Sequence, residues 1–163
     1  MVMACDLGSE VSVIESLKKV KGVKEVHGIL GLYDLIAQIE LDSETEIQDT
    51  VTKIIRRIPK IKSTMTMTRA ESEELFLKSK TSDNETNSYQ AYLMIHCNKG
   101  EEYPTLKNLC TIPEVKEADV VFGLYDVICK LESSDEKLLQ NVILKKIRIM
   151  PMIKTCVTLN VVN

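Results

Sequence analysis

Gly31-Leu32-Tyr33-Asp34 occurs twice in this chain, because the same four residues return 92 positions later (31 to 123) as Gly123-Leu124-Tyr125-Asp126. The match extends in both directions at that one offset without a gap. Further identical pairs are Cys5 and Cys97, Gly8 and Gly100, Val23-Lys24-Glu25 and Val115-Lys116-Glu117, Arg56 and Arg148, and Pro59 and Pro151. A repeat this regular predicts two copies of one folding unit.

Each copy shows the pattern of strand, helix, strand, strand, helix, strand. Alternating apolar residues favour strands, and a three-four spacing of apolar residues favours helices. In the first copy we expect strands at residues 2–6, 23–30, 35–41 and 61–67, and helices between Ser9 and Gly22 and between Ser43 and Pro59. In the second copy the corresponding elements are residues 91–98, 104–111, 115–122, 127–131, 135–150 and 153–161.

This order predicts an α+β fold with two tandem ferredoxin-like βαββαβ domains. Each domain would be a four-stranded antiparallel sheet with both helices on one face. Strands at residues 1–5 and 35–41 carry apolar side chains on both faces. We therefore expect the helix-free sheet faces of the two domains to pack against each other as a pseudo-dimer.

The expected domains are residues 1–70 and 91–163, with a linker at residues 71–90. A domain of about 70 residues buries only about 60% of its unfolded surface and is marginal alone, so shared buried surface is expected. The linker is polar and rich in turn-forming residues. Leu75-Phe76-Leu77 is its apolar exception, interpreted as one or two helical turns.

The composition is that of an ordinary globular protein, with 44% hydrophobic and 28% charged residues and a net charge of −3. A net charge of −3 does not indicate the basic surface that binding to nucleic acid requires. Without an apolar run of about 20 residues or a signal peptide, a soluble cytoplasmic protein is expected. The five cysteines are scattered with no Cys-x-x-Cys pair, which favours reduced, buried thiols over a disulfide or metal site.

The end of each copy adds a second recurring pattern. It is Ile58-Pro59-Lys60-Ile61-Lys62-Ser63-Thr64-Met65-Thr66 in the first and Met150-Pro151-Met152-Ile153-Lys154-Thr155-Cys156-Val157-Thr158 in the second. Together with the Gly-x-Tyr-Asp turn, this ordered set resembles the effector-binding (RAM) domain of Lrp/AsnC-type transcription regulators. The resemblance covers nearly the whole chain, twice, apart from the linker.

The resemblance implies pairing through the sheets, further assembly, and binding of amino acids or related small metabolites in clefts between domains. The family's usual regulator carries a helix-turn-helix before this domain. Here the first strand begins almost at Met1, so we expect no DNA-binding module and no direct contact with nucleic acid. The expected partners are a small-molecule effector and other copies of the chain or related regulators.

The Gly-x-Tyr-Asp turns supply the first candidate ligand-binding residues. Glycine allows a positive φ and a close approach of a ligand to the backbone. Aspartate could accept from a ligand's ammonium group, and tyrosine offers an apolar wall with a polar tip. These candidates are Gly31, Tyr33 and Asp34 with Gly123, Tyr125 and Asp126. The alternative is a turn that merely closes a hairpin, with the aspartate bonded to the backbone.

The closing strands supply the others. Thr64 and Thr66, with Thr158 in the second copy, match hydroxyls that the resemblance identifies with effector contacts. The alternative is ordinary β-branched filling of a strand. Thr64 is replaced by Cys156 in the second copy, which loses a strong hydrogen-bond donor and puts a second ligand site in doubt.

Other charged residues indicate no chemistry. A basic stretch at Lys53, Arg56, Arg57, Lys60 and Lys62 is interpreted as a solvated face, with phosphate binding as the alternative. His27 and His96 are not equivalent and have no carboxylate at catalytic spacing. We therefore expect no catalysis, cofactor or metal. The leading hypothesis is a sensing and oligomerisation module, and the alternative is a structural protein that forms hetero-oligomers with DNA-binding relatives without a ligand.

Overall fold

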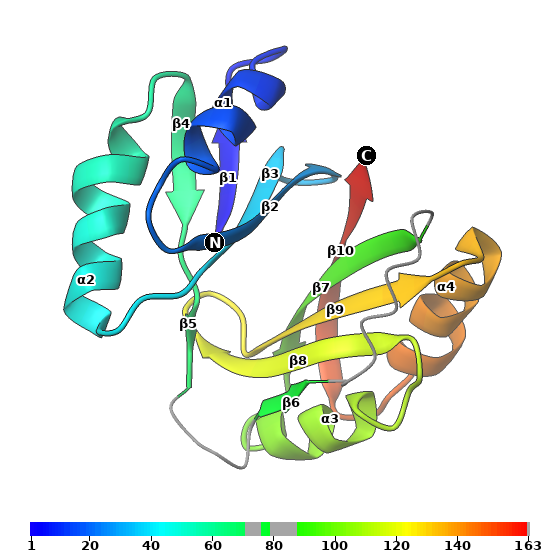
Figure 1. Cartoon of the computed structure of the whole chain (residues 1–163). Coiled ribbons are helices and arrows are strands. Elements are labelled where there is room, and N and C mark those ends of the chain that lie inside the picture. The colour runs from blue at the N-terminus through cyan, green and yellow to red at the C-terminus, as the bar shows by residue number, and fades with distance from the viewer. Residues whose placement is uncertain (71–75, 79–87, 163) are drawn as a thin grey trace. The chain divides into compact units, whose positions relative to one another are not determined.

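The computed structural model of the chain describes residues 1–70, 76–78 and 88–162, the middle range by its backbone alone. Its internal contacts divide the chain into two compact units. The first unit comprises residues 1–66 together with Val161 and Val162, and the second comprises residues 67–160. Figure 1 labels the elements of both units. The expected α+β class and the tandem ferredoxin-like domains are confirmed.

The first unit has the order predicted from the sequence. Its elements are β1 (Val2–Cys5), α1 (Glu10–Leu17), β2 (Val23–Leu30), β3 (Leu35–Ile39), α2 (Glu44–Asp49) continued by the π-helical η1 (Thr50–Ile54) and the 3-10 turn η2 (Ile55–Arg57), and β4 (Ile61–Met65). The strands lie in the order β4-β1-β3-β2, and all neighbours are antiparallel. This is the ferredoxin-like arrangement.

Capping residues explain where the helices of the first unit begin and end. Ser43 accepts a hydrogen bond from the Glu46 backbone N–H at 3.2 Å, as an N-cap does. Pro59 follows η2, and Lys60 then takes a φ of 75° to turn the chain into β4. Ser9 occupies the N-cap position of α1 but makes no side-chain cap hydrogen bond. The Ser9 hydroxyl donates to the Asp6 carbonyl at 2.5 Å and so closes the loop after β1.

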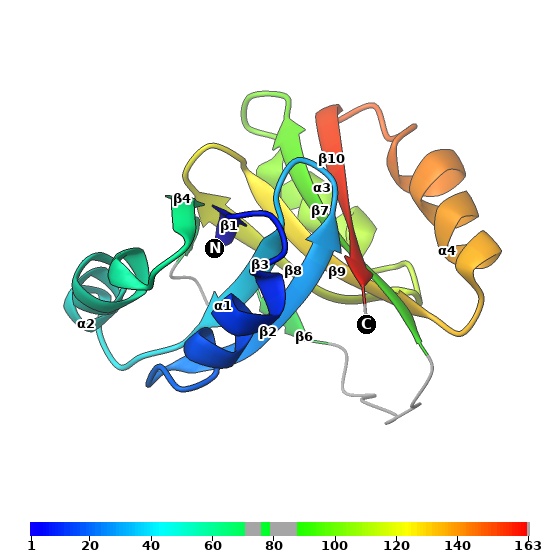
Figure 2. The same cartoon turned by 90° about the horizontal axis from the view of Figure 1, so that it is seen from above.

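The core of the first unit lies between its sheet and its helices. Met1, Met3 and Cys5 alternate along β1 and pack toward the helices. Val13 and Leu17 of α1 and Val51 and Ile55 of the second helical segment complete this core. Both helices therefore cover the same face of the sheet (Figures 1 and 2).

The second unit repeats the arrangement and adds to it. Its elements are β5 (Thr68–Arg69), β6 (Phe76–Lys78), β7 (Tyr89–Cys97), α3 (Glu102–Leu109), β8 (Val115–Phe122), β9 (Val127–Ser133), α4 (Glu136–Val142) continued by the π-helical η4 (Ile143–Ile147), and β10 (Ile153–Val162). The main sheet has the order β10-β7-β9-β8, and β5 and β6 both pair with β8. Leu93 and Ile95 face Leu106, Leu109 and Ile147 of the helices.

The region expected as a linker is partly strand. Residues 76–78 form β6 and not the helical turns expected there, because the outer edge of β8 offers unpaired backbone groups that an extended segment satisfies. Leu75 and most of the expected linker lie outside the described residues. The boundaries at residues 70 and 91, and the packing of the two helix-free faces, stay predictions. Within the described ranges, no helix has the length and apolar character to cross a membrane.

Candidate functional site

The two Gly-x-Tyr-Asp sequences form equivalent hairpin turns. Gly31 lies between β2 and β3 with a φ of 147°, and Gly123 lies between β8 and β9 with a φ of 149°. Residues other than glycine rarely adopt such φ values, so these positions require glycine. Both glycines are exposed, which leaves their backbone open to solvent.

The two aspartates join each hairpin to the first strand of its unit. Asp34 Oδ2 accepts from the Cys5 backbone N–H at 2.8 Å, and Asp126 Oδ2 accepts from the Cys97 backbone N–H at 2.9 Å. In the first unit the pairing of β1 with β3 stops at Met3 and Leu35. The carboxylate therefore extends the ladder by one bond beyond the last paired residues. This is a structural role close to the alternative weighed for the turn, although the bonded N–H belongs to another strand.

The tyrosines of the turns have different surroundings in the two units. The Tyr33 hydroxyl donates to the Met65 sulfur of β4 at 3.6 Å. Tyr125 is 7% exposed, and its ring stacks on His96 with centroids 4.5 Å apart and an interplanar angle of 24°. His96 Nδ1 lies 3.5 Å from Asp126 Oδ2. The second turn is therefore a packed cluster of ring, imidazole and carboxylate.

Each histidine has a carboxylate beside it, which the sequence did not predict. The contact of His96 has no counterpart in the first unit, because the residue equivalent to His96 there is Ala4. His27 Nε2 lies 3.4 Å from Glu25 Oε2 on β2. That contact has a sequence signal, since residues two apart on a strand share a face.

The threonines of the closing strands contact equivalent arginines in different registers. Arg56 Nε donates to Thr64 Oγ1 at 2.9 Å in the first unit. Arg148 Nη2 donates to Thr158 Oγ1 at 2.9 Å in the second. Arg56 and Arg148 are equivalent, but Thr158 corresponds to Thr66 and not to Thr64. The guanidinium thus selects a hydroxyl two residues further along the same face.

This change of register leaves the two units chemically unlike. Cys156 occupies the place of Thr64, near the Arg148 guanidinium. Burial raises the pKa of the Cys156 thiol, and the nearby guanidinium opposes that rise. In the first unit Thr66 Oγ1 is buried with no hydrogen-bond partner among the described residues. A buried hydroxyl without a partner is uncommon and calls for an explanation.

The predicted site residues lie on two faces of each sheet. On β4, Thr64 lies opposite Met3, a residue of the helix-side core, whereas Met65, which contacts Tyr33, points to the other face. Cys156 packs with the helix-side core of the second unit, so the threonine face is the face that the helices cover. Tyr33 therefore lies on the helix-free face, away from Thr64.

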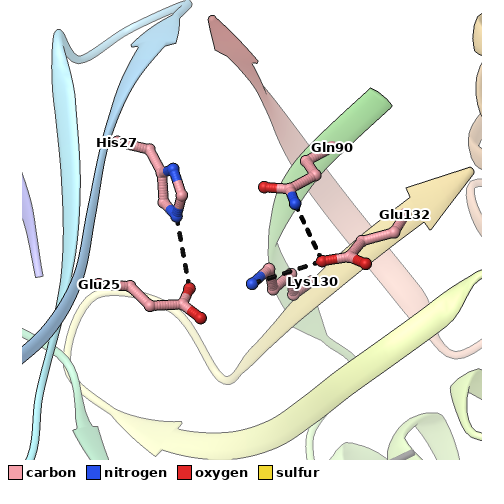
Figure 3. Close-up of polar contacts among 5 residues, drawn as sticks. All are labelled: Glu25, His27, Gln90, Lys130 and Glu132. Carbon is pink, nitrogen blue, oxygen red and sulfur yellow. Dashed lines mark hydrogen bonds and ion pairs between the residues drawn. The ribbon is translucent and has the colours of Figure 1, made fainter. Parts of the chain in front are cut away.

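The helix-free sides carry further polar contacts that the sequence did not single out (Figure 3). In the first unit these are the Glu25 and His27 side chains of β2. In the second unit Glu132 Oε1 accepts from Gln90 Nε2 at 3.1 Å and lies 3.5 Å from Lys130 Nζ. Lys130 is 8% exposed, and its ammonium group lies 6.0 Å from the centroid of the Tyr92 ring. A buried lysine of this kind is stabilised by its carboxylate and its aromatic neighbour.

All five cysteines are free thiols. Burial is the main cause of the raised pKa of the Cys5, Cys97 and Cys129 thiols. Within the part of the chain that the structure describes, no group of three or more His, Cys, Asp or Glu side chains is arranged to hold a metal ion.

Comparison with known protein families identifies these units. The model of the Lrp/AsnC ligand binding domain matches the chain twice, over residues 9–72 and over residues 90–163. The chain belongs to the Lrp/AsnC ligand binding domain family. The resemblance inferred from the turns and closing strands is thereby confirmed, in both copies. Each Lrp/AsnC match contains one Gly-x-Tyr-Asp turn and one closing strand.

Three solved structures are similar to parts or nearly all of this chain. The crystal structure of FFRP-DM1 is 38% identical over 45% of this chain and 99% of its own, with a TM-score of 0.44. The hypothetical protein PHS023 from Pyrococcus horikoshii is 37% identical over 46% of this chain and 90% of its own, with a TM-score of 0.45. The siroheme decarboxylase NirDL is 7% identical over 99% of this chain and 70% of its own, with a TM-score of 0.68, and shows a shared fold alone. No curated protein matches the sequence.

Proposed function

We propose that this chain is a non-catalytic cytoplasmic module that binds a small molecule, namely an amino acid or a related metabolite. We also propose that it assembles with other copies of itself or with related regulators. The observation that carries the proposal is the double match to a ligand binding domain family. Ligand binding would shift assembly by the difference in ligand affinity between the assembled and free states.

The first unit is the better candidate for the working site. There, Thr66 Oγ1 is buried without a hydrogen-bond partner among the described residues. Thr66 follows by two residues Thr64, which accepts a hydrogen bond from Arg56. A bound carboxylate would supply an acceptor for the Thr66 hydroxyl and a partner for the Arg56 guanidinium. In the second unit Arg148 already donates to Thr158, the equivalent of Thr66. We therefore propose one amino-acid site per chain, in the first unit.

Isothermal titration of the full chain against the amino acids tests the proposal. Thr66→Val keeps the shape of the side chain and removes the hydroxyl. Loss of one hydrogen bond to a charged ligand group corresponds to about 1.5 to 3 kcal/mol, or a roughly 10- to 150-fold weaker affinity. Thr158→Val in the second unit is the matched control and should leave the affinity unchanged. Absence of heat with every amino acid would count against sensing.

The alternative is a structural protein that forms hetero-oligomers with DNA-binding Lrp/AsnC-type regulators without a ligand. One observation favours a role in assembly. Both hairpin turns expose two large apolar side chains at equivalent positions: Leu30 at 63% and Leu32 at 67% in the first unit, and Phe122 at 67% and Leu124 at 60% in the second. Exposed apolar groups gathered at one place are typical of interaction sites.

Co-purification with a DNA-binding member of the family separates the alternatives. A structural partner should co-purify equally well with and without added amino acids, and Leu32→Ser with Leu124→Ser should abolish the complex. A sensing module should change its assembly when the amino acid is added. A chain recovered only with itself would exclude mixed assembly.

A further inference from the structure

Residues 68–69 and 76–78, which follow β4 and precede β7 in the chain, cover the outer edge of β8. They do so in two stretches whose opposite residues on β8 are as follows: Thr68 with Phe122, Arg69 with Val121, Phe76 with Asp119, Leu77 with Ala118, and Lys78 with Glu117. Both stretches run antiparallel to β8. The opposite residue falls steadily along β8 as the chain advances, so the two stretches act as one interrupted edge strand. We call residues 68–70 and 76–78 the edge segment.

Backbone and side-chain contacts hold the first stretch of the edge segment in place. The Ala70 backbone N–H donates to the Val120 carbonyl at 2.9 Å, and Ala70 is 7% exposed within the core of the second unit. Arg69 Nη2 donates to Asp119 Oδ2 at 3.1 Å. Arg69 Nε also lies 3.0 Å from Asp119 Oδ1, close enough for charge attraction although the hydrogen-bond geometry is poor.

The Arg69–Asp119 pair also fixes the register of the edge segment. Arg69 lies opposite Val121, and Asp119 is two residues from Val121 on the same face of β8, so the pair is a diagonal cross-strand contact. A shift of one residue would turn Arg69 to the other face and break the contact. The pair therefore selects one alignment of this segment on β8.

The burial of Asp119 makes this contact consequential. The Asp119 side chain is 9% exposed, and the Arg69 side chain is 47% exposed. Burial raises the pKa of the Asp119 carboxyl, the Arg69 guanidinium opposes the rise, and the Glu117 carboxylate adds to it. Without Arg69 the carboxylate would stay buried beside Glu117 with its main cation removed, which is the costly way to break such a pair.

We propose that the outer edge of β8 is a strand-docking surface, closed in cis by the edge segment and keyed by Arg69, and that it accepts the same segment from a second copy of the chain when the cis contact is released. The edge segment is the occupant that this surface fits, since its register and its ion pair are already present. Only short strands hold it, and exchange of an identical element between copies is a low-cost route to assembly. The inference stands apart from ligand binding, because none of these residues belongs to the candidate ligand site.

The test uses the full chain with Arg69→Met, which removes the cation and keeps an apolar side chain of similar length. Arg57→Met, on η2 of the first unit, is the matched control for the loss of one charge. The probe is a fluorescent peptide of residues 67–78, with a second peptide that carries Met in place of Arg69. Binding is followed by anisotropy, and mass by size exclusion with light scattering.

The native peptide should bind the Arg69→Met chain at least tenfold more tightly than it binds wild type or the Arg57→Met control. The peptide that lacks Arg69 should bind at least tenfold more weakly than the native peptide. Because the edge segment of Arg69→Met also lacks Arg69, exchange between copies of that variant should not increase, and light scattering should give the mass of one chain plus one peptide for the complex. Equal peptide binding by all three chains would overturn the proposal.

A second variant covers the case in which Arg69→Met does not fold. Arg69→Lys keeps the positive charge and loses the two-point geometry of the guanidinium. Hydrogen exchange of the Ala70 amide should be at least tenfold faster in Arg69→Lys than in wild type. An unchanged Ala70 exchange rate would show that Arg69 does not hold the segment on β8.

Discussion

Asp34→Ala should destabilise the first unit by removing the carboxylate that accepts from the Cys5 amide. That bond is 2.8 Å long, Cys5 is 4% exposed, and Asp34 is half-buried. A hydrogen bond to a charged group contributes about 1.5 to 3 kcal/mol, and an unsatisfied buried donor costs about 1 to 3 kcal/mol. Because water can reach the half-buried carboxylate position, we expect the lower part of that range, about 1 to 2 kcal/mol.

Asp34→Asn is the discriminating companion variant, because its amide oxygen can still accept from Cys5. A neutral hydrogen bond contributes about 0.5 to 1.5 kcal/mol, so Asp34→Asn should lose about half as much stability as Asp34→Ala. Asp126→Ala removes the equivalent bond to Cys97 in the second unit. Its additional contact with His96 lies between side chains that are 35% and 37% exposed, and such pairs contribute little.

The assay combines urea unfolding with amide hydrogen exchange, because exchange assigns the loss to one unit. Asp34→Ala should speed exchange at Cys5 and leave Cys97 unchanged, and Asp126→Ala should do the reverse. An unchanged Cys5 exchange rate in Asp34→Ala, with a free energy of unfolding within about 0.3 kcal/mol of wild type, would refute the role assigned to the carboxylate.

Three further outcomes are expected. Burial raises the pKa of the Asp119 carboxyl above its ordinary value of 3.8, so the folded state holds that proton more tightly than the unfolded state. The free energy of unfolding should therefore fall as the pH rises from the unfolded pKa through the folded pKa of Asp119. Asp119→Asn should flatten that fall in urea titrations from about pH 3 to about pH 6, and an unaltered slope would contradict the assignment. Cys129 is 1% exposed, and burial raises the pKa of its thiol. Alkylation of the native protein, measured by mass spectrometry, should therefore be slower at Cys129 than at the partly exposed Cys110. Equal alkylation rates at the two thiols would contradict this expectation. Cys156→Thr restores to the second unit the hydroxyl of the first and should raise the calorimetric stoichiometry of amino-acid binding toward two per chain, whereas an unchanged stoichiometry would speak against the proposed ligand role of this position.

Local sequence signals were sufficient for the βαββαβ elements of each unit, but not for β5 and β6. The three-four spacing in the helices marks which of their side chains face the core, and the repeat doubles this signal. The need for glycine at Gly31 and Gly123 was also readable, because a tight turn restricts φ within a few residues. Faces and turns are properties of short stretches, so the sequence alone determined them.

Contacts between strands were decided only by the tertiary structure. Nothing near Asp34 in the sequence shows that its carboxylate meets the Cys5 amide, 29 residues away. The equivalent Arg56 and Arg148 donate to hydroxyls two positions apart, Thr64 in the first unit and Thr158 in the second, which has Cys156 in the place of Thr64. Likewise, residues 76–78 are extended because they pair with the edge of β8. The backbone hydrogen bonds of that pairing outweigh the local preference of these residues for a helix. A polar group bonds whatever the fold brings within about 3 Å, and that neighbour is set by the packing of whole elements rather than by adjacent residues.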